Sequence, residues 1–246
     1  MGFLTTAIAG CFFLIGAFLA YVGKNKKGLV EFSLGLSFSV MILLLAFDIV
    51  PEVMELLEVK GKIFMYVFIA FGIIMLKLLD LLVPHHDHEA EIKTHERHLK
   101  HIGIISSLAL IVHNVIEGIA IYNVTMFDFK AGILMAVGVG LHNIPFGIEI
   151  TATLSETKKK KSHVLTYILV LTLSTVLGAL AMFVFKGVSD FVLGSLMSLA
   201  IGMIVYLVLF EILGELLSIK DKKYSRAGIL IGILFMAIIL LIGGGE

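Results

Sequence analysis

The stretch from residue 102 to residue 123 reads IGIISSLALIVHNVIEGIAIYN. It is long enough to cross a bilayer, because about 20 predominantly apolar residues span the hydrocarbon core as a helix. Three polar residues, His113, Asn114 and Glu117, stand near the middle of the stretch. A carboxylate at the centre of a membrane helix costs about 2.5–3.5 kcal/mol, so such residues persist where they pair or line a wet path. We therefore expect a transmembrane helix that carries a functional polar group.

The rest of the chain has the same apolar character. Hydrophobic residues make up 59% of the sequence and the mean hydropathy is +1.06, whereas soluble domains stay near about 45–50% apolar. Lipid must therefore cover the surface, and we predict one all-α integral membrane domain over residues 1–246. Eight stretches are long enough to be transmembrane helices: about 3–22, 29–51, 63–83, 102–123, 131–153, 163–186, 190–213 and 227–243.

Charge and motif content exclude several other classes. The formal net charge is zero, so no nucleic-acid partner is expected. Cys11 is the only cysteine and can form no internal disulfide. The sequence has no glycine-rich phosphate loop, so neither ATP nor another cofactor is expected.

Lysine and arginine are concentrated in every second connection between the predicted helices. Basic residues mark cytoplasmic connections, so the first, third, fifth and seventh connections should face the cytoplasm. Both termini are then extracytoplasmic. The residues that set this bias are Lys24, Lys26, Lys27, Lys93, Arg97, Lys100, Lys158, Lys159, Lys160, Lys161, Lys220, Lys222, Lys223 and Arg226.

Two short motifs recur in helices that run in opposite directions. FDIVPE at 47–52, near the end of the second helix, resembles FEILGE at 210–215 in the seventh. HNVIEG at 113–118 in the fourth helix resembles HNIPFG at 142–147 in the fifth. Inverted repeats are typical of transporters whose substrate site lies near the bilayer midplane. We predict eight helices with inverted repeats, in the arrangement 3+2+3. For the FDIVPE/FEILGE pair taken alone, a chance match of short apolar segments is the alternative.

Polar residues of the fourth and fifth helices form the predicted metal site. His113 and Glu117 are four residues apart and share one helix face, and Asn114 lines the adjoining face. His142 and Glu149 share a face about two turns apart. Two imidazoles and two carboxylates that face one another suit a borderline divalent cation such as zinc or ferrous iron. The alternative is a structural polar network that ties the two helices together.

Further acidic residues lie nearer the ends of the membrane helices. Asp48 and Glu52 are near the outer end of the second helix, and Glu211 and Glu215 are near the inner end of the seventh. By symmetry the two pairs form an outer and an inner funnel for a cation, with ordinary solvation of helix ends as the alternative. Asp80, at the inner end of the third helix, is expected to form a structural pair with a lysine three residues before it.

The segment 84–101 between the third and fourth helices holds six of the nine histidines. A polar, His-rich tract in a cytoplasmic loop is typical of a low-affinity metal-collecting segment. A solvated linker is the alternative, and the two are compatible. The histidines are His85, His86, His88, His95, His98 and His101.

These features together resemble the ZIP (Zrt-, Irt-like) family of divalent metal transporters over nearly the whole chain. In that family the fourth helix shows His-Asn-x-Pro-Glu-Gly. His113, Asn114, Glu117 and Gly118 match this motif, whereas Ile116 stands at the proline position.

The fifth and sixth helices depart further from the family pattern. His142 and Asn143 match, but Phe146 stands where a metal-bridging glutamate is usual, and Thr175 replaces an acid of the sixth helix. The loss of two acids implies one metal site rather than two. Glu149, one turn inward of Phe146, either replaces part of the missing charge or serves the inner path.

The resemblance implies a metal site with ligands from two helices. His113, Glu117 and His142 form it, and water, Met41 or Asn143 completes the shell. The function implied is transport of zinc, with iron, manganese or cobalt as other cargo, toward the cytoplasm. The resemblance also implies alternating access, in which helices one, four, five and six move as a unit. The protein is then expected to be a homodimer in the cell membrane, most simply the plasma membrane of a prokaryote.

Two other functions are weighed against transport. The first is a metal sensor or transport-dead paralogue, which the missing acids at Phe146 and Thr175 motivate. The second is an intramembrane metalloenzyme that uses the same histidines to activate water. The common zinc-protease motif His-Glu-x-x-His is absent, so we do not expect an enzyme.

Overall fold

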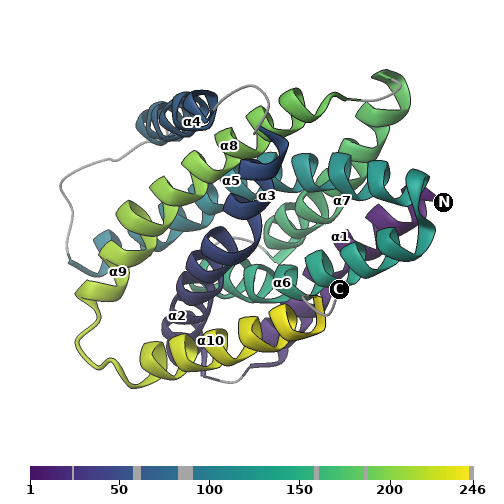
Figure 1. Cartoon of the computed structure of the whole chain (residues 1–246). Helices are drawn as coiled ribbons and strands as arrows, with labels where there is room; N and C mark the ends of the chain where they lie inside the picture. The colour runs from purple at the N-terminus through teal and green to yellow at the C-terminus, as the bar shows by residue number, and fades with distance from the viewer. Residues whose placement is uncertain (24, 58–61, 83–90, 158–160, 186–187, 244–246) are drawn as a thin grey trace.

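The computed structural model describes residues 1–23, 25–57, 62–82, 91–157, 161–185 and 188–243. Within these ranges every regular element is a helix, and eight spans are long and apolar enough to cross a membrane, as predicted. In chain order the helices are α1 (Gly2–Val22), α2 (Lys26–Leu44), η1 (Leu45–Ile49), α3 (Val50–Leu56), α4 (Ile63–Leu82), α5 (Glu91–Phe127), α6 (Phe129–Glu156), α7 (Lys161–Phe185), α8 (Asp190–Tyr206), η3 (Leu207–Ile212), α9 (Leu213–Ser218) and α10 (Lys223–Gly243) (Figure 1).

Two of the spans contain a π-helical segment. The span Lys27–Leu56 is interrupted by η1, and the span Asp190–Ser218 is interrupted by η3. These are the two places where the sequence repeats the FDIVPE and FEILGE motifs, and each π segment holds the acid of its motif, Asp48 or Glu211. Because π-helical turns are rare and occur frequently at functional sites, both positions call for a functional explanation.

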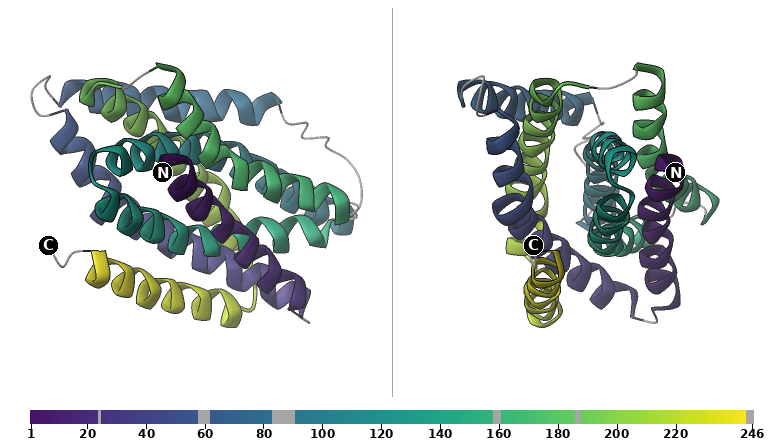
Figure 2. Two further views of the ribbon diagram at one scale, coloured as in Figure 1. Left: turned by 90° about the vertical axis from the view of Figure 1, so that its right-hand side faces the viewer. Right: turned by 45° about the vertical axis from the view of Figure 1, so that its right-hand side comes forward.

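The helices pack in two groups. The first group is α1, α5, α6 and α7, in which α1 packs on α6 and α7, and α5 packs on the same two helices. In the second group α10 packs on α2, and α3 and α4 pack on α8. The groups meet where α2 packs on α6 and α5 packs on α8. The right-hand view of Figure 2 shows the teal helices α5 and α6 between the second group and the pair α1 and α7.

Glycines allow close approach inside the first group. A Cβ atom on Gly118 of α5 would lie 1.9 Å from the carbonyl oxygen of Thr175 on α7. Conversely, a Cβ atom on Gly178 of α7 would lie 2.0 Å from the carbonyl oxygen of Val115 on α5. Both contacts are far too short for a real side chain, so this crossing requires glycine on both helices.

A tight turn joins the two helices that carry the His-Asn motifs. α5 ends at Phe127 and α6 begins at Phe129. Asp128 caps α6, because its Oδ1 atom accepts hydrogen bonds from the backbone amides of Lys130 at 2.8 Å and Ala131 at 3.3 Å. The turn makes α5 and α6 antiparallel neighbours and brings their polar residues to the same depth.

The His-rich segment differs from its expected form. Residues 83–90 lie outside the described residues, and with them His85, His86 and His88. From Glu91 onward the chain is helical as the first part of α5, so the expected loop 84–101 is too long at its C-terminal end. The physical reason is composition, because residues 91–101 contain good helix formers such as glutamate, lysine, leucine and arginine and no glycine or proline.

Candidate metal centre

Three side chains from α5 and α6 form a buried cluster, here called the His113 cluster. The Oε1 atom of Glu117 lies 2.9 Å from Nε2 of His113 and 2.9 Å from Nε2 of His142. The two imidazole rings are 6.2 Å apart between centroids, and only 3% of His113 and 2% of His142 is exposed. One carboxylate oxygen therefore sits between two imidazoles, and Glu149, which the spacing also placed in the site, is not part of this cluster.

The cluster has the donor set and nearly the dimensions of a zinc site. The three ligand atoms lie within 4.8 Å of one another. In a tetrahedral zinc site with bonds of about 2.0–2.1 Å, neighbouring ligand atoms are about 3.3 Å apart. The present nitrogen–oxygen separations of 2.9 Å would need to open by only a few tenths of an ångström.

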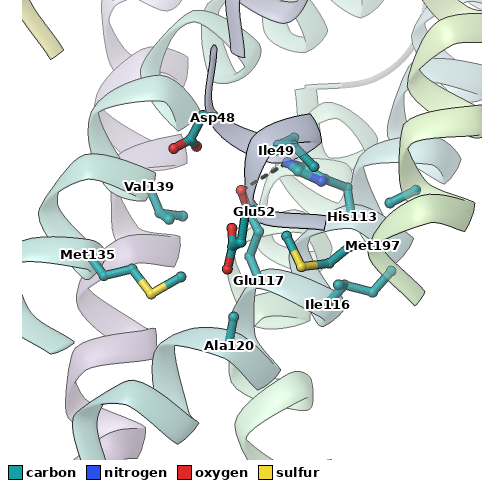
Figure 3. A pocket seen from close by; sticks show the side chains of 11 residues that line it. Asp48, Ile49, Glu52, His113, Ile116, Glu117, Ala120, Met135, Val139 and Met197 are labelled. Atoms are coloured by element: carbon teal, nitrogen blue, oxygen red, sulfur yellow. Dashed lines mark ion pairs between the residues drawn. The ribbon is translucent and has the colours of Figure 1, made fainter. Parts of the chain in front are cut away.

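An acid-lined cavity reaches the cluster from the side of η1 and α3. A cavity of about 40 Å³ is bounded by His113 and Glu117 on one side and by Asp48 and Glu52 on the other. Figure 3 shows the Asp48 and Glu52 carboxylates beside Glu117, whose Oε2 atom has no hydrogen-bond partner among the described residues. A larger cavity of about 530 Å³ shares Asp48 and Glu52 and is lined by His142. The His113 cluster thus adjoins a cavity whose lining includes further carboxylates.

The two predicted asparagines connect helices. The Asn114 amide donates to the Leu171 carbonyl oxygen at 3.2 Å and to Ser174 Oγ at 3.0 Å, both on α7. The Asn143 amide donates to the carbonyl oxygen of Ala9 on α1 at 3.2 Å. The Oδ1 atoms of both asparagines have no hydrogen-bond partner in the described part of the chain. The repeated asparagine therefore ties each central helix to a different neighbour within the first group.

The other predicted positions lie near the cluster but outside it. Met41 is fully buried in the apolar core and does not line either of these cavities. Phe146 is also buried, with its ring centroid 6.1 Å from that of His142. Glu149 is completely buried and accepts a hydrogen bond from Ser106 Oγ at 3.1 Å.

A second cluster, here called the His101 cluster, joins three elements. His101 of α5 pairs with Asp80 of α4, and its Nε2 atom lies 3.7 Å from Glu211 Oε2 of η3. Tyr206 donates a hydrogen bond to Asp80 Oδ2 at 2.8 Å. The three ligand atoms of Asp80, His101 and Glu211 lie within 4.8 Å of one another, and all three residues are buried.

Sequence reasoning did not connect the members of this second cluster. The structure brings Asp80 to His101 and Tyr206, contacts that its spacing along its own helix does not indicate. Glu211 and Glu215 are buried rather than solvated at a helix end. The signal available in the sequence was the repeat of FDIVPE as FEILGE. It makes Glu211 of η3 the counterpart of Asp48 of η1, which lies beside the His113 cluster.

The fold and the His113 cluster together define a class of protein: a multi-pass helical membrane protein with a buried imidazole–carboxylate cluster whose donor set is compatible with a divalent cation. The chain belongs to the ZIP zinc transporter family, whose family model matches residues 84–240. The resemblance inferred from the His-Asn motifs is thereby confirmed.

Curated relatives cover almost the whole chain. The zinc transporter ZupT of Streptococcus mutans is 28% identical, over 98% of this chain and 96% of the relative. The ZupT proteins of Shigella dysenteriae and Oceanobacillus iheyensis are 26% and 27% identical over 97% and 98% of this chain, and the alignments cover 95% and 97% of those relatives. The alignments thus extend over nearly the whole chain and are not confined to one segment.

Proposed function

We propose that this protein transports a divalent cation, zinc foremost and iron, manganese or cobalt as other cargo, toward the cytoplasm. The observation that carries the proposal is the single Glu117 oxygen held 2.9 Å from two imidazole nitrogens in a buried site. Nitrogen and oxygen donors in such a set suit zinc and its neighbours. Family membership and the ZupT relatives support transport as the use of this site.

The acidic residues on either side define a path for the cation. Asp48 and Glu52 attract it into the cavities beside the His113 cluster. The His101 cluster, with Asp80 and Glu211, provides a further set of donors on the other side. Along α5 the residues His113 and His101 are separated by about 18 Å, which places the two clusters at different depths of the membrane.

We further propose the topology that the sequence predicts. Helices α2–η1–α3 and α8–η3–α9 are inverted counterparts, and so are α5 and α6. The matched π segments η1 and η3 support the first relation, and the matched asparagine contacts to α7 and α1 support the second. Basic connections on the cytoplasmic side leave both termini outside.

Alternating access fits the two packing groups. The group of α1, α5, α6 and α7 carries both histidines of the His113 cluster, while Asp48 and Glu52 belong to the second group. Movement of one group against the other would change the access to His113 and Glu117 from the acid-lined side. We propose that the protein does this as a homodimer in the cell membrane.

Uptake by the reconstituted protein tests the proposal. Zinc uptake into liposomes should be abolished by Glu117→Ala, because the shared ligand oxygen is lost, while the yield of purified protein stays unchanged. Glu156→Gln, on α6 but outside both clusters, is the control and should transport like the wild type. Normal uptake by Glu117→Ala would refute the site.

One observation favours a second function, a metal-binding protein that does not transport. Phe146 and Thr175 stand at positions where the family usually has acids, and both are buried. Zinc binding by calorimetry, together with no uptake by wild-type protein in liposomes, would establish this function in place of transport.

A further inference from the structure

Glu149 occupies a site of its own, about two turns along α6 from His142. Its carboxylate is 0% exposed and accepts a hydrogen bond from Ser106 Oγ of α5 at 3.1 Å. The Ser37 hydroxyl of α2 neighbours the carboxylate but completes no hydrogen bond by distance and angle. The site thus combines oxygen donors from α2, α5 and α6.

The site has unsatisfied oxygen atoms and no countercharge. Glu149 Oε2 and Ser37 Oγ are both fully buried without a hydrogen-bond partner in the described ranges, and so is Thr153 Oγ1 one turn further along α6. None of the lysine, arginine or histidine side chains that the structure describes forms an ion pair with Glu149. A buried carboxylate with open coordination positions is a favourable place for a cation, because an unpaired charge is costly in an apolar interior.

The position of this site continues the line of the His113 cluster. Ser106 precedes His113 by seven residues on α5, and Glu149 follows His142 by seven residues on α6. Since the two helices are antiparallel, both steps lead in the same direction by about 10 Å. Phe146 lies between His142 and Glu149 on α6, and its buried ring is 6.1 Å from the His142 ring between centroids.

We propose that Glu149, with the hydroxyls of Ser106 and Ser37, is a second binding site for the transported divalent cation, separated from the His113 cluster by the Phe146 ring. This inference rests on the proposed transport function. The site lies where α2 of the second group meets α5 and α6 of the first. An all-oxygen site with one carboxylate binds zinc more weakly than imidazole does, which suits brief occupation after the cation leaves the His113 cluster.

Zinc binding by purified protein tests the site directly. Glu117→Gln weakens the His113 cluster and should leave weaker residual binding. Adding Glu149→Gln to that variant should reduce the residual affinity at least about tenfold, because the only carboxylate of the second site is lost. Adding Glu156→Gln instead, the same change seven residues further along α6, should leave the residual zinc affinity unaltered. Equal binding by Glu117→Gln and Glu117→Gln/Glu149→Gln would overturn the proposal.

Uptake separates this inference from the proposed function. Glu149→Gln alone should lower zinc uptake into liposomes at least about tenfold, with affinity at the His113 cluster kept within twofold of the wild type. Ser106→Ala keeps the Glu149 carboxylate and should lower uptake about fivefold through one lost hydrogen bond. This second variant keeps the test valid if Glu149→Gln does not fold. If the wild type transports and both variants equal it, only this inference fails. If the wild type does not transport, the proposed function fails and this inference with it.

Discussion

The His113 cluster and the His101 cluster have similar chemistry but are assembled differently. The first takes its three ligands from α5 and α6, two neighbouring helices joined by one residue. The second takes Asp80, His101 and Glu211 from α4, α5 and η3, which are distant in the sequence. The first cluster faces a cavity, and the second has a tyrosine hydroxyl on one carboxylate. A local helix pair thus forms a cluster that opens to a cavity, whereas the distant elements form a cluster that also links the two packing groups.

If that contrast is right, removing the imidazole of the His101 cluster should have the largest effect on stability. His101→Ala leaves Asp80 and Glu211 as buried carboxylates without the imidazole between them. We expect a loss of about 3 kcal/mol in the free energy of unfolding, the lower end of the range for breaking a buried pair. Denaturant unfolding in detergent measures it, and His163→Ala, at an exposed position on α7, is the control. A loss below about 0.5 kcal/mol, typical of a surface substitution, would show that the His101 cluster does not stabilise the fold.

The matching change in the His113 cluster should act on metal affinity instead. His142→Ala removes one of three ligands, and even changes to groups around metal ligands typically cost about 10–100-fold in affinity. We expect zinc affinity to fall at least about 100-fold in calorimetry, with unfolding changed less than by His101→Ala. An unaltered zinc affinity would mean that the cation binds elsewhere.

Restoring the family's acid at Phe146 should have the smallest of the three effects. Phe146→Glu places a carboxylate one turn from His142 and should raise zinc affinity about tenfold, within the range of changes next to a metal site. Phe146→Gln, of similar size and polarity without the charge, is the matched control. No gain from Phe146→Glu would mean that a carboxylate at this position does not reach a cation in the His113 cluster.

The parts predicted from sequence are those fixed by local spacing. Apolar stretches fixed the eight spans, and the four-residue spacing of His113 and Glu117 placed both on one face of α5. The partner His142 was found because its motif repeats that of His113 at matching depth. Position along a helix gives depth and face, so these residues needed no tertiary information.

The parts that sequence did not predict depend on how distant helices pack. Asp80 meets His101 because α4, which packs on α8, also contacts α5 directly. The roles of Asn114 and Asn143 as ties to α7 and α1 likewise follow from neighbours that the motif does not specify. The hydrogen bond from Ser106 to Glu149 could not be predicted from sequence, because a serine in a membrane helix ordinarily bonds to the backbone of its own helix.

Zinc-edge X-ray absorption on protein loaded with one zinc per chain tests the central claim most directly. We predict two imidazole nitrogens and a carboxylate oxygen at about 2.0–2.2 Å from the ion, and a loss of the imidazole signal in the variant His113→Ala/His142→Ala. A spectrum without imidazole ligands in the wild type, or one that the double substitution leaves unchanged, would contradict the account.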